Sequence, residues 1–236
     1  SAARRPLMAE RLSIIVPAFN EAARISAQLA TLVRLSGVDE IIVVDGGSVD
    51  RTPQLAAAAG CRVMTAPPGR GTQMNAGADA ASGDILLFLH ADVTLPADAP
   101  SLIRTVLADP GVVAGAFRTR TIAEGRRTWA TRWLGLADLR SRYTRLPYGD
   151  QALFVRRDAF QRVGGFPSQP LFEDVEISRR LRSIGRVQTL RAHVRVSGRR
   201  FLARPLYFAI LMNVLPILYR LGVSPQTLQR AYGDVR

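Results

Sequence analysis

Lysine is absent from this sequence, and all 32 basic residues of the 236-residue chain are arginine. The absence excludes any mechanism that needs a lysine amine, among them the Walker-type phosphate loop. Cysteine is almost absent as well, since Cys61 stands alone. One cysteine cannot form a disulfide or a cysteine-based zinc site within the chain, and it fits a reducing compartment.

Long hydrophobic runs are also missing. The most apolar segment, residues 205–221, is interrupted by Asn213 and Pro216, whereas a membrane-spanning helix needs about 20 consecutive apolar residues. We expect this segment to pack on the domain, with contact at a membrane interface as the alternative. Residues 1–10 contain arginines but no apolar core, so we expect no signal peptide.

Acidic residues are scarce in the second half of the chain. Residues 1–115 hold 9 arginines and 11 acidic residues (net −2), while residues 116–236 hold 23 arginines and 8 acidic residues (net +15). Such a basic half should attract phosphate-bearing partners or an anionic membrane surface. We do not expect nucleic acid as a partner, because the chain has no aromatic-basic recognition motif and no zinc-finger spacing.

The hydrophobic pattern predicts an α/β fold. Strand-like runs at 12–16, 40–44, 62–65 and 84–89 are separated by three predicted helices. This alternation implies right-handed crossovers and a doubly wound, mostly parallel, Rossmann-like sheet. Further expected features are helix caps at Asn20 and Asp50, strands at 112–117 and 151–155, a helix carrying Trp129, Trp133 and Leu136, and a helix at 173–184.

Two polar side chains end the fourth predicted strand. His90 and Asp92 fall on one side of it if the extended backbone persists that far, at the carboxyl edge where open α/β sheets bind ligands. The pair could hold a divalent cation: carboxylates suit Mg²⁺ and Mn²⁺, and an imidazole shifts the preference towards Mn²⁺. The alternative is that Asp92 caps the turn at Leu95 and Pro96, and that His90 is a satisfied edge residue.

Other nucleotide and phosphate motifs fail on this sequence. The first strand is followed by Pro17-Ala18-Phe19-Asn20-Glu21, not by the Gly-x-Gly-x-x-Gly of dinucleotide-binding domains. The glycine pattern that starts at Gly69 fails at Met74. His90 stands where an aspartate-nucleophile phosphatase needs its first aspartate, so we do not expect covalent phosphoryl transfer by that route.

Six motifs in order, between Ile14 and about Phe201, give the sequence a family resemblance. They are Ile15-Val16-Pro17-Ala18-Phe19-Asn20-Glu21, Val43-Val44-Asp45-Gly46-Gly47-Ser48-Val49-Asp50-Arg51-Thr52, Gly69-Arg70-Gly71-Thr72-Gln73-Met74-Asn75, Phe88-Leu89-His90-Ala91-Asp92, Gly149-Asp150-Gln151 and Glu173-Asp174. Together they resemble the inverting family-2 glycosyltransferases of the GT-A fold. The set is most similar to the small bacterial group associated with arsenosugar-type biosynthesis.

The resemblance implies a nucleoside-diphosphate sugar as donor and a divalent cation, Mn²⁺ or Mg²⁺, that bridges its two phosphates. His90-Ala91-Asp92 occupies the position of the family's Asp-x-Asp motif, with His90 in place of the first aspartate. The donor-binding residues implied are Pro17, Phe19, Glu21, Asp45, Ser48, Arg70, Asn75, Asp150 and Gln151; the last two could contact the acceptor instead.

Two further arginines are candidates for the donor phosphates. Arg199 and Arg200 carry guanidinium groups, which pair bidentately with phosphate. The wider family often has a Gln-x-x-Arg-Trp signature in that region, which this chain lacks. Solvated surface arginines are the alternative.

The resemblance also implies that Asp174 is the general base for the acceptor hydroxyl, held beside Glu173 at a helix start. Direct displacement with one base predicts inversion at the anomeric carbon. The alternative is that both acids only cap their helix and interact favourably with its dipole.

These expectations combine into one domain organisation. Residues 12–201 form a GT-A domain, with a nucleotide-binding half at 12–95 and an acceptor half at 96–201. Residues 1–11 are a leader, with disorder as one alternative, and residues 202–236 are a C-terminal apolar helical segment on the acceptor side.

We expect a hydroxyl-bearing acceptor, a small molecule or a lipid, and a cytoplasmic location, with peripheral contact to the inner membrane as an option. A nucleotidyltransferase-like enzyme and a non-catalytic nucleotide-binding or membrane-associated protein remain alternatives.

Overall fold

The computed structural model describes residues 10–122, 147–198 and 214–232. Most of the predicted leader, the predicted helix with Trp129 and Trp133, and both Arg199 and Arg200 lie outside the described residues.

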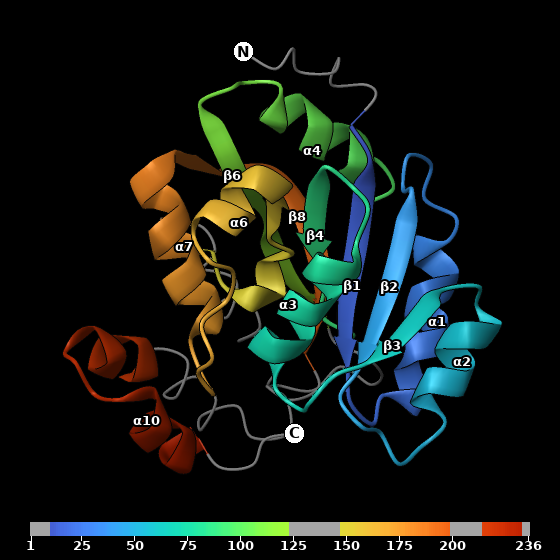
Figure 1. Cartoon of the computed structure of the whole chain (residues 1–236), viewed down its shortest axis with the longest axis horizontal. Helices are drawn as coiled ribbons and strands as arrows, with labels where there is room; N and C mark the ends of the chain where they lie inside the picture. Colours follow the sequence, from blue (N-terminus) through green and yellow to red (C-terminus); the bar gives the residue numbers. More distant parts are fainter. Residues whose placement is uncertain (1–9, 123–146, 199–213, 233–236) are drawn as a thin grey trace.

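An eight-stranded sheet forms the centre of the molecule, in the order β3-β2-β1-β4-β7-β6-β8-β5 (Figure 1). β1 is parallel to β2 and β4, β2 to β3, and β6 to β8, whereas β7 and β5 run antiparallel to their neighbours. The predicted mostly parallel α/β sheet is therefore confirmed. The strands are β1 (Leu12–Ala18), β2 (Glu40–Asp45), β3 (Arg62–Thr65), β4 (Ile85–Phe88), β5 (Val93–Thr94), β6 (Val112–Ile122), β7 (Phe154–Arg156) and β8 (Arg186–Ser197).

Helices cover both faces of this sheet. They are α1 (Ala22–Leu32), α2 (Thr52–Ala58), α3 (Arg70–Ala80), α4 (Ala99–Leu107), the 3-10 turn η3 (Gly149–Gln151), α6 (Arg157–Arg162), α7 (Glu173–Ile184) and α10 (Pro225–Tyr232). Apolar residues of α1 and α4 join one core cluster, and those of α3, α6 and α7 join a second. Ile14 belongs to the first cluster and Ile15 to the second, so the two clusters lie on opposite faces of the sheet.

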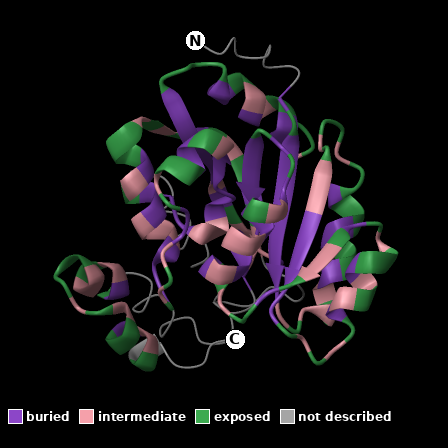
Figure 2. Ribbon diagram, in the orientation of Figure 1, coloured by how far each residue is buried: buried purple, intermediate pink, exposed green. Residues whose placement is uncertain are grey.

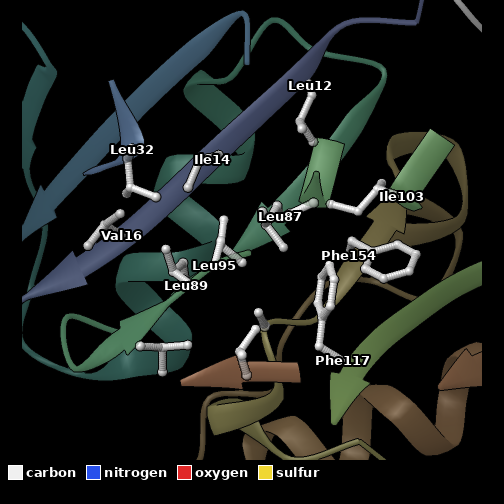
Figure 3. Packing of buried hydrophobic residues seen from close by; sticks show 14 of the residues in the cluster. Leu12, Ile14, Val16, Leu32, Leu87, Leu89, Leu95, Ile103, Phe117 and Phe154 are labelled. Carbon is white, nitrogen blue, oxygen red and sulfur yellow. The ribbon is translucent and has the colours of Figure 1, made fainter. Parts of the chain in front are cut away.

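The continuous apolar runs in the sequence follow from this two-sided burial. β1 and β4 are buried along their whole length (Figure 2), as strands covered by helices on both faces must be. Figure 3 shows Leu12, Ile14 and Leu87 from these strands converging with Phe117 and Phe154 in the first cluster. The sheet is thus a rigid support, and its carboxyl edge can position side chains accurately.

Two expectations about local structure are wrong, and one strand was missed. The strand expected at 151–155 begins only at Phe154, because Ala152 adopts left-handed backbone angles (φ 51°) after the η3 turn. Asn20 does not cap α1: it has φ 53°, and its side chain accepts a hydrogen bond from the Val49 N–H (3.0 Å). β8 was not expected at all.

The carboxylate of Asp50 serves the starts of two helices. It accepts hydrogen bonds from the backbone N–H groups of Thr52 (2.9 Å) and Ala22 (3.0 Å), the first residues of α2 and α1. Asp50 thereby satisfies donors that a helix start leaves unpaired.

Part of the C-terminal apolar segment packs on the domain, as expected. Residues 214–220 are helical, Leu215 is buried, and Tyr219 stacks on Phe172 at the start of α7 with ring centroids 4.8 Å apart. Val214 and Ile217 stay exposed. None of the helices in the described ranges is long and apolar enough to cross a membrane.

Candidate active site

A pocket of about 400 Å³ opens at the carboxyl edge of the sheet. Its walls come from the loop after β1, the start of α3, the turn after β4, the loop before α7 and one residue of α10. Among the residues predicted to bind donor or metal, those that line it are Pro17, Phe19, Glu21, Arg70, His90 and Asp92. The structure thus brings six of the predicted residues, spread over some 75 positions of sequence, to one cavity.

Asp45 and Ser48 build the loop beside the pocket and do not line it. Asp45 accepts hydrogen bonds from the N–H groups of Gly47 (3.0 Å) and Ser48 (2.9 Å), and Ser48 Oγ accepts one from the Asn20 N–H (2.8 Å). The two side chains therefore tie the loop after β2 to the loop after β1, and so support Phe19 and Glu21.

The turn after β4 holds His90 and Asp92 in place. β4 ends at Phe88 and residues 91–92 form a turn. The prediction that strand alternation places His90 and Asp92 on the same side is therefore wrong. Both nevertheless line the pocket. The Asp92 carboxylate makes no hydrogen bond or ion pair with any residue in the described ranges, which disfavours the capping alternative and leaves its oxygens available to a ligand.

Two buried glutamines fix these loops by donating to backbone carbonyls. Gln28 on α1 donates to His90 O (2.6 Å) and Val93 O (2.9 Å), on either side of Asp92. Gln73 on α3 donates to Ala18 O (2.9 Å) and Val44 O (2.8 Å), which lie just before the loops after β1 and β2.

Neither glutamine was identified from the sequence, although a signal existed. Gln28 occupies a position of the apolar face formed by Ile25, Leu29 and Leu32, where a polar residue needs a buried partner.

Gly149 brings His90 and Asp174 to the same point. Its N–H donates a hydrogen bond to Asp174 Oδ2. A Cβ at position 149 would lie 2.8 Å from His90 Nε2 and 3.3 Å from Asp174 Oδ2, so the missing side chain of glycine leaves room for both groups. The predicted base and the predicted metal-binding turn therefore approach each other at Gly149, although 82 positions separate Asp174 from Asp92 in the sequence.

Buried Glu173 forms an ion pair with Arg70, a half-exposed residue of the pocket wall. Its Oε1 lies 3.1 Å from Nε of Arg70, whose side chain is 47% exposed, while the Glu173 side chain is only 4% exposed. Burial raises the pKa of Glu173 to about 7, opposed by Arg70 and assisted by the negative charge of Asp174. Glu173 thus fixes the Arg70 guanidinium at the pocket wall rather than facing the cavity itself.

Asn75 connects α3 to the opposite wall of the pocket. Its amide donates to Phe166 O (2.9 Å) and accepts from Phe166 N–H (2.9 Å). The loop anchored there, residues 167–171, lines the cavity. Asn75 itself does not line the pocket; the structure places it behind that loop.

Asp150 and Gln151 lie in η3, next to the Gly149 contact. The Gln151 side chain is 2% exposed; its amide donates to Phe117 O (3.0 Å) and accepts from Tyr148 N–H (2.8 Å). These bonds hold η3 against β6, and neither Asp150 nor Gln151 lines the cavity. Their predicted contact with sugar or acceptor remains a prediction.

The donor set at the turn fits a divalent cation that also binds phosphate. Within the described ranges no group of three or more His, Cys, Asp and Glu side chains could hold a metal alone. Mg²⁺ and Mn²⁺ at phosphate sites commonly take only one or two protein ligands, with phosphate and water oxygens completing the shell. Asp92, with His90 beside it, fits that pattern.

Solved structures of glycosyltransferases share this fold. A mannosyltransferase from Pyrobaculum calidifontis, in complex with GDP-Man and Mn²⁺, superposes with a TM-score of 0.71 at 21% identity, covering 92% of this chain and 66% of that one. Glucosyl-3-phosphoglycerate synthase from Mycobacterium tuberculosis, in complex with Mn²⁺, UDP and glucosyl-3-phosphoglycerate, gives a TM-score of 0.53 at 23% identity, covering 81% and 77%.

Sequence comparison identifies the family. A PGL/p-HBAD biosynthesis glycosyltransferase from Mycobacterium bovis is 32% identical over 171 residues, 68% of this chain and 64% of that protein. Glucosyl-3-phosphoglycerate synthase from Mycolicibacterium smegmatis is 34% identical over 122 residues, 45% of this chain, and the match spans only 40% of that relative's length. The model of glycosyl transferase family 2 matches residues 13–164. This chain belongs to glycosyl transferase family 2.

Proposed function

We propose that this chain is a metal-dependent, inverting glycosyltransferase that moves a sugar from a nucleoside-diphosphate sugar to a hydroxyl acceptor. The observation that carries the proposal is the meeting of Asp174 and His90 at Gly149, beside the pocket that Asp92 lines. The family and the nucleotide complexes of its structural neighbours support it. They also favour glycosyl transfer over nucleotidyl transfer.

Asp174 is the general base of this proposal. Its carboxylate takes the proton of the acceptor hydroxyl as the acceptor oxygen bonds to the anomeric carbon, and the bond from that carbon to the donor phosphate breaks. One displacement from the face opposite the leaving group inverts the anomeric configuration. The Gly149 N–H bond holds one carboxylate oxygen, and Val175 N–H donates to the other (2.8 Å), so the orientation of the base is fixed.

The donor would occupy the pocket along the carboxyl edge. Pro17, Phe19, Glu21 and Arg70 line it; the first three would border the nucleotide, and Arg70 would face its phosphates. Asp92 with His90 would hold a cation, Mn²⁺ or Mg²⁺, that stabilises negative charge on the departing diphosphate. Arg199 and Arg200 remain predicted phosphate ligands, outside the described residues.

Several finer assignments stay predictions. They are the arsenosugar-type subgroup, the choice between a small-molecule and a lipid acceptor, the cytoplasmic location and the peripheral membrane contact. A relative that is 29% identical over 58% of this chain is named as an undecaprenyl-phosphate transferase, which makes a lipid acceptor a reasonable candidate to test.

The test separates chemistry from donor binding. Asp174→Asn should lower transfer by about 10²- to 10⁴-fold, the range for loss of a general base, while nucleoside-diphosphate binding stays within about twofold of the wild type. Asp92→Ala should instead weaken binding measured with Mn²⁺ and leave binding without metal unchanged. The donor is identified by testing a panel of nucleotide sugars, each with Mn²⁺ and with Mg²⁺. For each one we measure its hydrolysis by the protein and the thermal stabilisation of the protein.

Asp158→Asn is the matched control. Asp158 is exposed on α6 and pairs with Arg162 at 3.5 Å, so its substitution removes the same charge away from the pocket. Near-normal turnover by Asp174→Asn would refute the assignment of the base. Absence of any metal-dependent nucleotide binding by the wild type would refute the proposed function as a whole.

A further inference from the structure

Two neighbouring strands carry basic side chains on one shared face. In the parallel pair β6 and β8, Arg118 lies opposite His193 and Arg120 opposite Arg195. The β8 register shifts near Arg191, but its neighbours Leu190 and Ala192 both pack in the first core cluster, so Arg191 projects to the same side as His193. We refer to these five residues, Arg118, Arg120, Arg191, His193 and Arg195, as the basic ladder.

The basic ladder lies on the side of the sheet that carries α7. Val194 belongs to the core cluster of α1 and α4, so its neighbours on β8 point to the opposite face. On that opposite face Val187, near the start of β8, packs with α7 residues such as Ile177. The basic ladder and Asp174 at the start of α7 therefore share one side of the sheet.

The far end of β8 reaches the candidate active site. The Ser197 N–H donates a hydrogen bond to the Asp92 carbonyl (3.1 Å). Arg195 lies two residues before that contact, opposite Thr94 of β5. The basic ladder thus extends along the strands towards the turn that is proposed to hold the metal.

Among the described residues, no carboxylate neutralises the basic ladder. The side chains of its five members make no hydrogen bond or ion pair there, and β6 and β8 contain no Asp or Glu. Other arginines of the described chain, such as Arg62, Arg104 and Arg186, pair with carboxylates.

Arg118 adds a second observation that indicates a ligand. Its Nε is buried and has no hydrogen-bond partner in the structure. An unsatisfied buried donor destabilises a folded chain, and so do like charges placed directly opposite each other on paired strands, as Arg120 and Arg195 are. A bound anion would remove both costs.

We propose that the basic ladder binds a phosphate group of the acceptor, and that the acceptor is therefore a phosphate-bearing molecule with a free hydroxyl. The inference rests on the proposed function, which places the acceptor beside Asp174. Phosphate suits the basic ladder because guanidinium groups pair with it bidentately and several strand-borne arginines can share its oxygens. A neutral acceptor would leave the five side chains without a partner among the described residues.

The experiment measures the binding of two phosphate probes to the whole chain. One probe is phosphoglyceric acid, and the other is a phosphatidylcholine vesicle that contains a polyprenyl phosphate, with plain phosphatidylcholine vesicles as blank. The wild type should bind one of them, more weakly as salt rises. The double variant Arg120→Gln/Arg195→Gln should bind that probe about tenfold more weakly or worse, since hydrogen bonds to charged groups contribute about 1.5–3 kcal/mol each. Which probe binds distinguishes a soluble from a lipid-borne phosphate.

The matched control is Arg34→Gln/Arg162→Gln, which removes the same charge from exposed positions elsewhere. It should change probe affinity by less than about twofold, because long-range attraction is screened at physiological salt. Binding of nucleoside diphosphate with Mn²⁺ should stay unchanged in both double variants. That readout keeps failure of this inference distinct from failure of the proposed function.

A charge reversal separates ligand binding from a structural role. Arg195→Glu would place a carboxylate opposite Arg120, so the unfolding midpoint should rise or stay constant while probe binding is lost. The inference is overturned if the wild type binds neither probe, if the control double variant loses as much affinity as the ladder variant, or if Arg195→Glu binds phosphate as the wild type does.

Discussion

Replacement of Glu173 by glutamine tests how the pocket wall is built. The Glu173 side chain is 4% exposed, and one of its oxygens contacts Arg70 at 3.1 Å while the other, Oε2, is buried without a hydrogen-bond partner. Burial raises the pKa of Glu173 from 4.5 to about 7. Glutamine keeps the size of the side chain and an oxygen for Arg70 but cannot ionise.

The pKa shift sets the sign and size of the effect. The folded state binds the Glu173 proton more tightly than the unfolded state does. The protonated carboxyl therefore contributes its full stabilisation of the fold below pH 4.5, and this contribution is lost as the pH rises through about 7. The shift corresponds to about 3 kcal/mol at pH 8. The amide NH₂ of glutamine would be buried without a partner, which costs about 1–3 kcal/mol. We therefore expect Glu173→Gln to be up to about 2 kcal/mol more stable than the wild type at pH 8 and less stable at pH 4.5.

The measurement is the free energy of unfolding in urea, taken for wild type and variant between pH 4.5 and pH 8.5. Glu176→Gln on the same helix is the control, because its effect on the free energy of unfolding should change with pH in the opposite direction. Hydrogen bonds from Arg179 hold the pKa of Glu176 below its usual value, so its ionised form stabilises the fold and its loss should destabilise the protein most at high pH. If the difference between wild type and Glu173→Gln does not change with pH, burial of an ionisable carboxyl is not what limits stability here.

Two further substitutions test how the site residues are positioned. Gln28→Leu removes both hydrogen bonds to the turn around Asp92, so it should weaken Mn²⁺-dependent nucleotide binding about 10-fold or more while metal-free binding stays unchanged. Gln73→Leu frees the loops after β1 and β2 instead, so it should weaken nucleotide binding both with and without metal. If the two variants lose the same affinity with and without metal, the two glutamines do not have these separate roles. Gly149→Ala would place a methyl group 2.8 Å from His90 Nε2, so we expect transfer to fall at least about 10-fold in a steady-state assay with the melting temperature nearly unchanged. Full activity would show that the close approach of His90 and Asp174 to Gly149 is not needed.

Local patterns were sufficient to predict the nucleotide-binding half of the fold. β1, β2 and β4 are buried on both faces, so their sequences are almost uninterrupted apolar runs, and α1 shows Ile25, Leu29 and Leu32 at helical spacing. Each of these signals lies within a dozen residues. The carboxyl ends of such strands meet at one edge, which is why Pro17, Phe19 and Asp92 could be expected to share a pocket.

The contacts that assemble the site span too much sequence for such patterns. His90, Gly149 and Asp174 meet because β7 inserts between β4 and β6 and reverses direction there. Nothing near Gly149 in the sequence indicates that its missing side chain makes room for His90. Similarly, Asn75 holds the loop at Phe166, 91 residues away, so this predicted donor-binding residue lies behind the loop that lines the cavity.

β8 shows why the basic side of the molecule escaped prediction. Its inward residues Leu190, Ala192 and Val194 alternate with Arg191, His193 and Arg195, which is the pattern of a strand with one face in the core and one in water. No strand was predicted for this segment from the sequence. Once β8 is paired with β6, the same arginines form a row beside which the described part of the chain places no carboxylate. Composition assigns the charge excess only to half of the chain, whereas the strand pairing places five basic side chains on one face, close to the Asp92 turn. This placement is the basis for the proposal that the acceptor carries a phosphate.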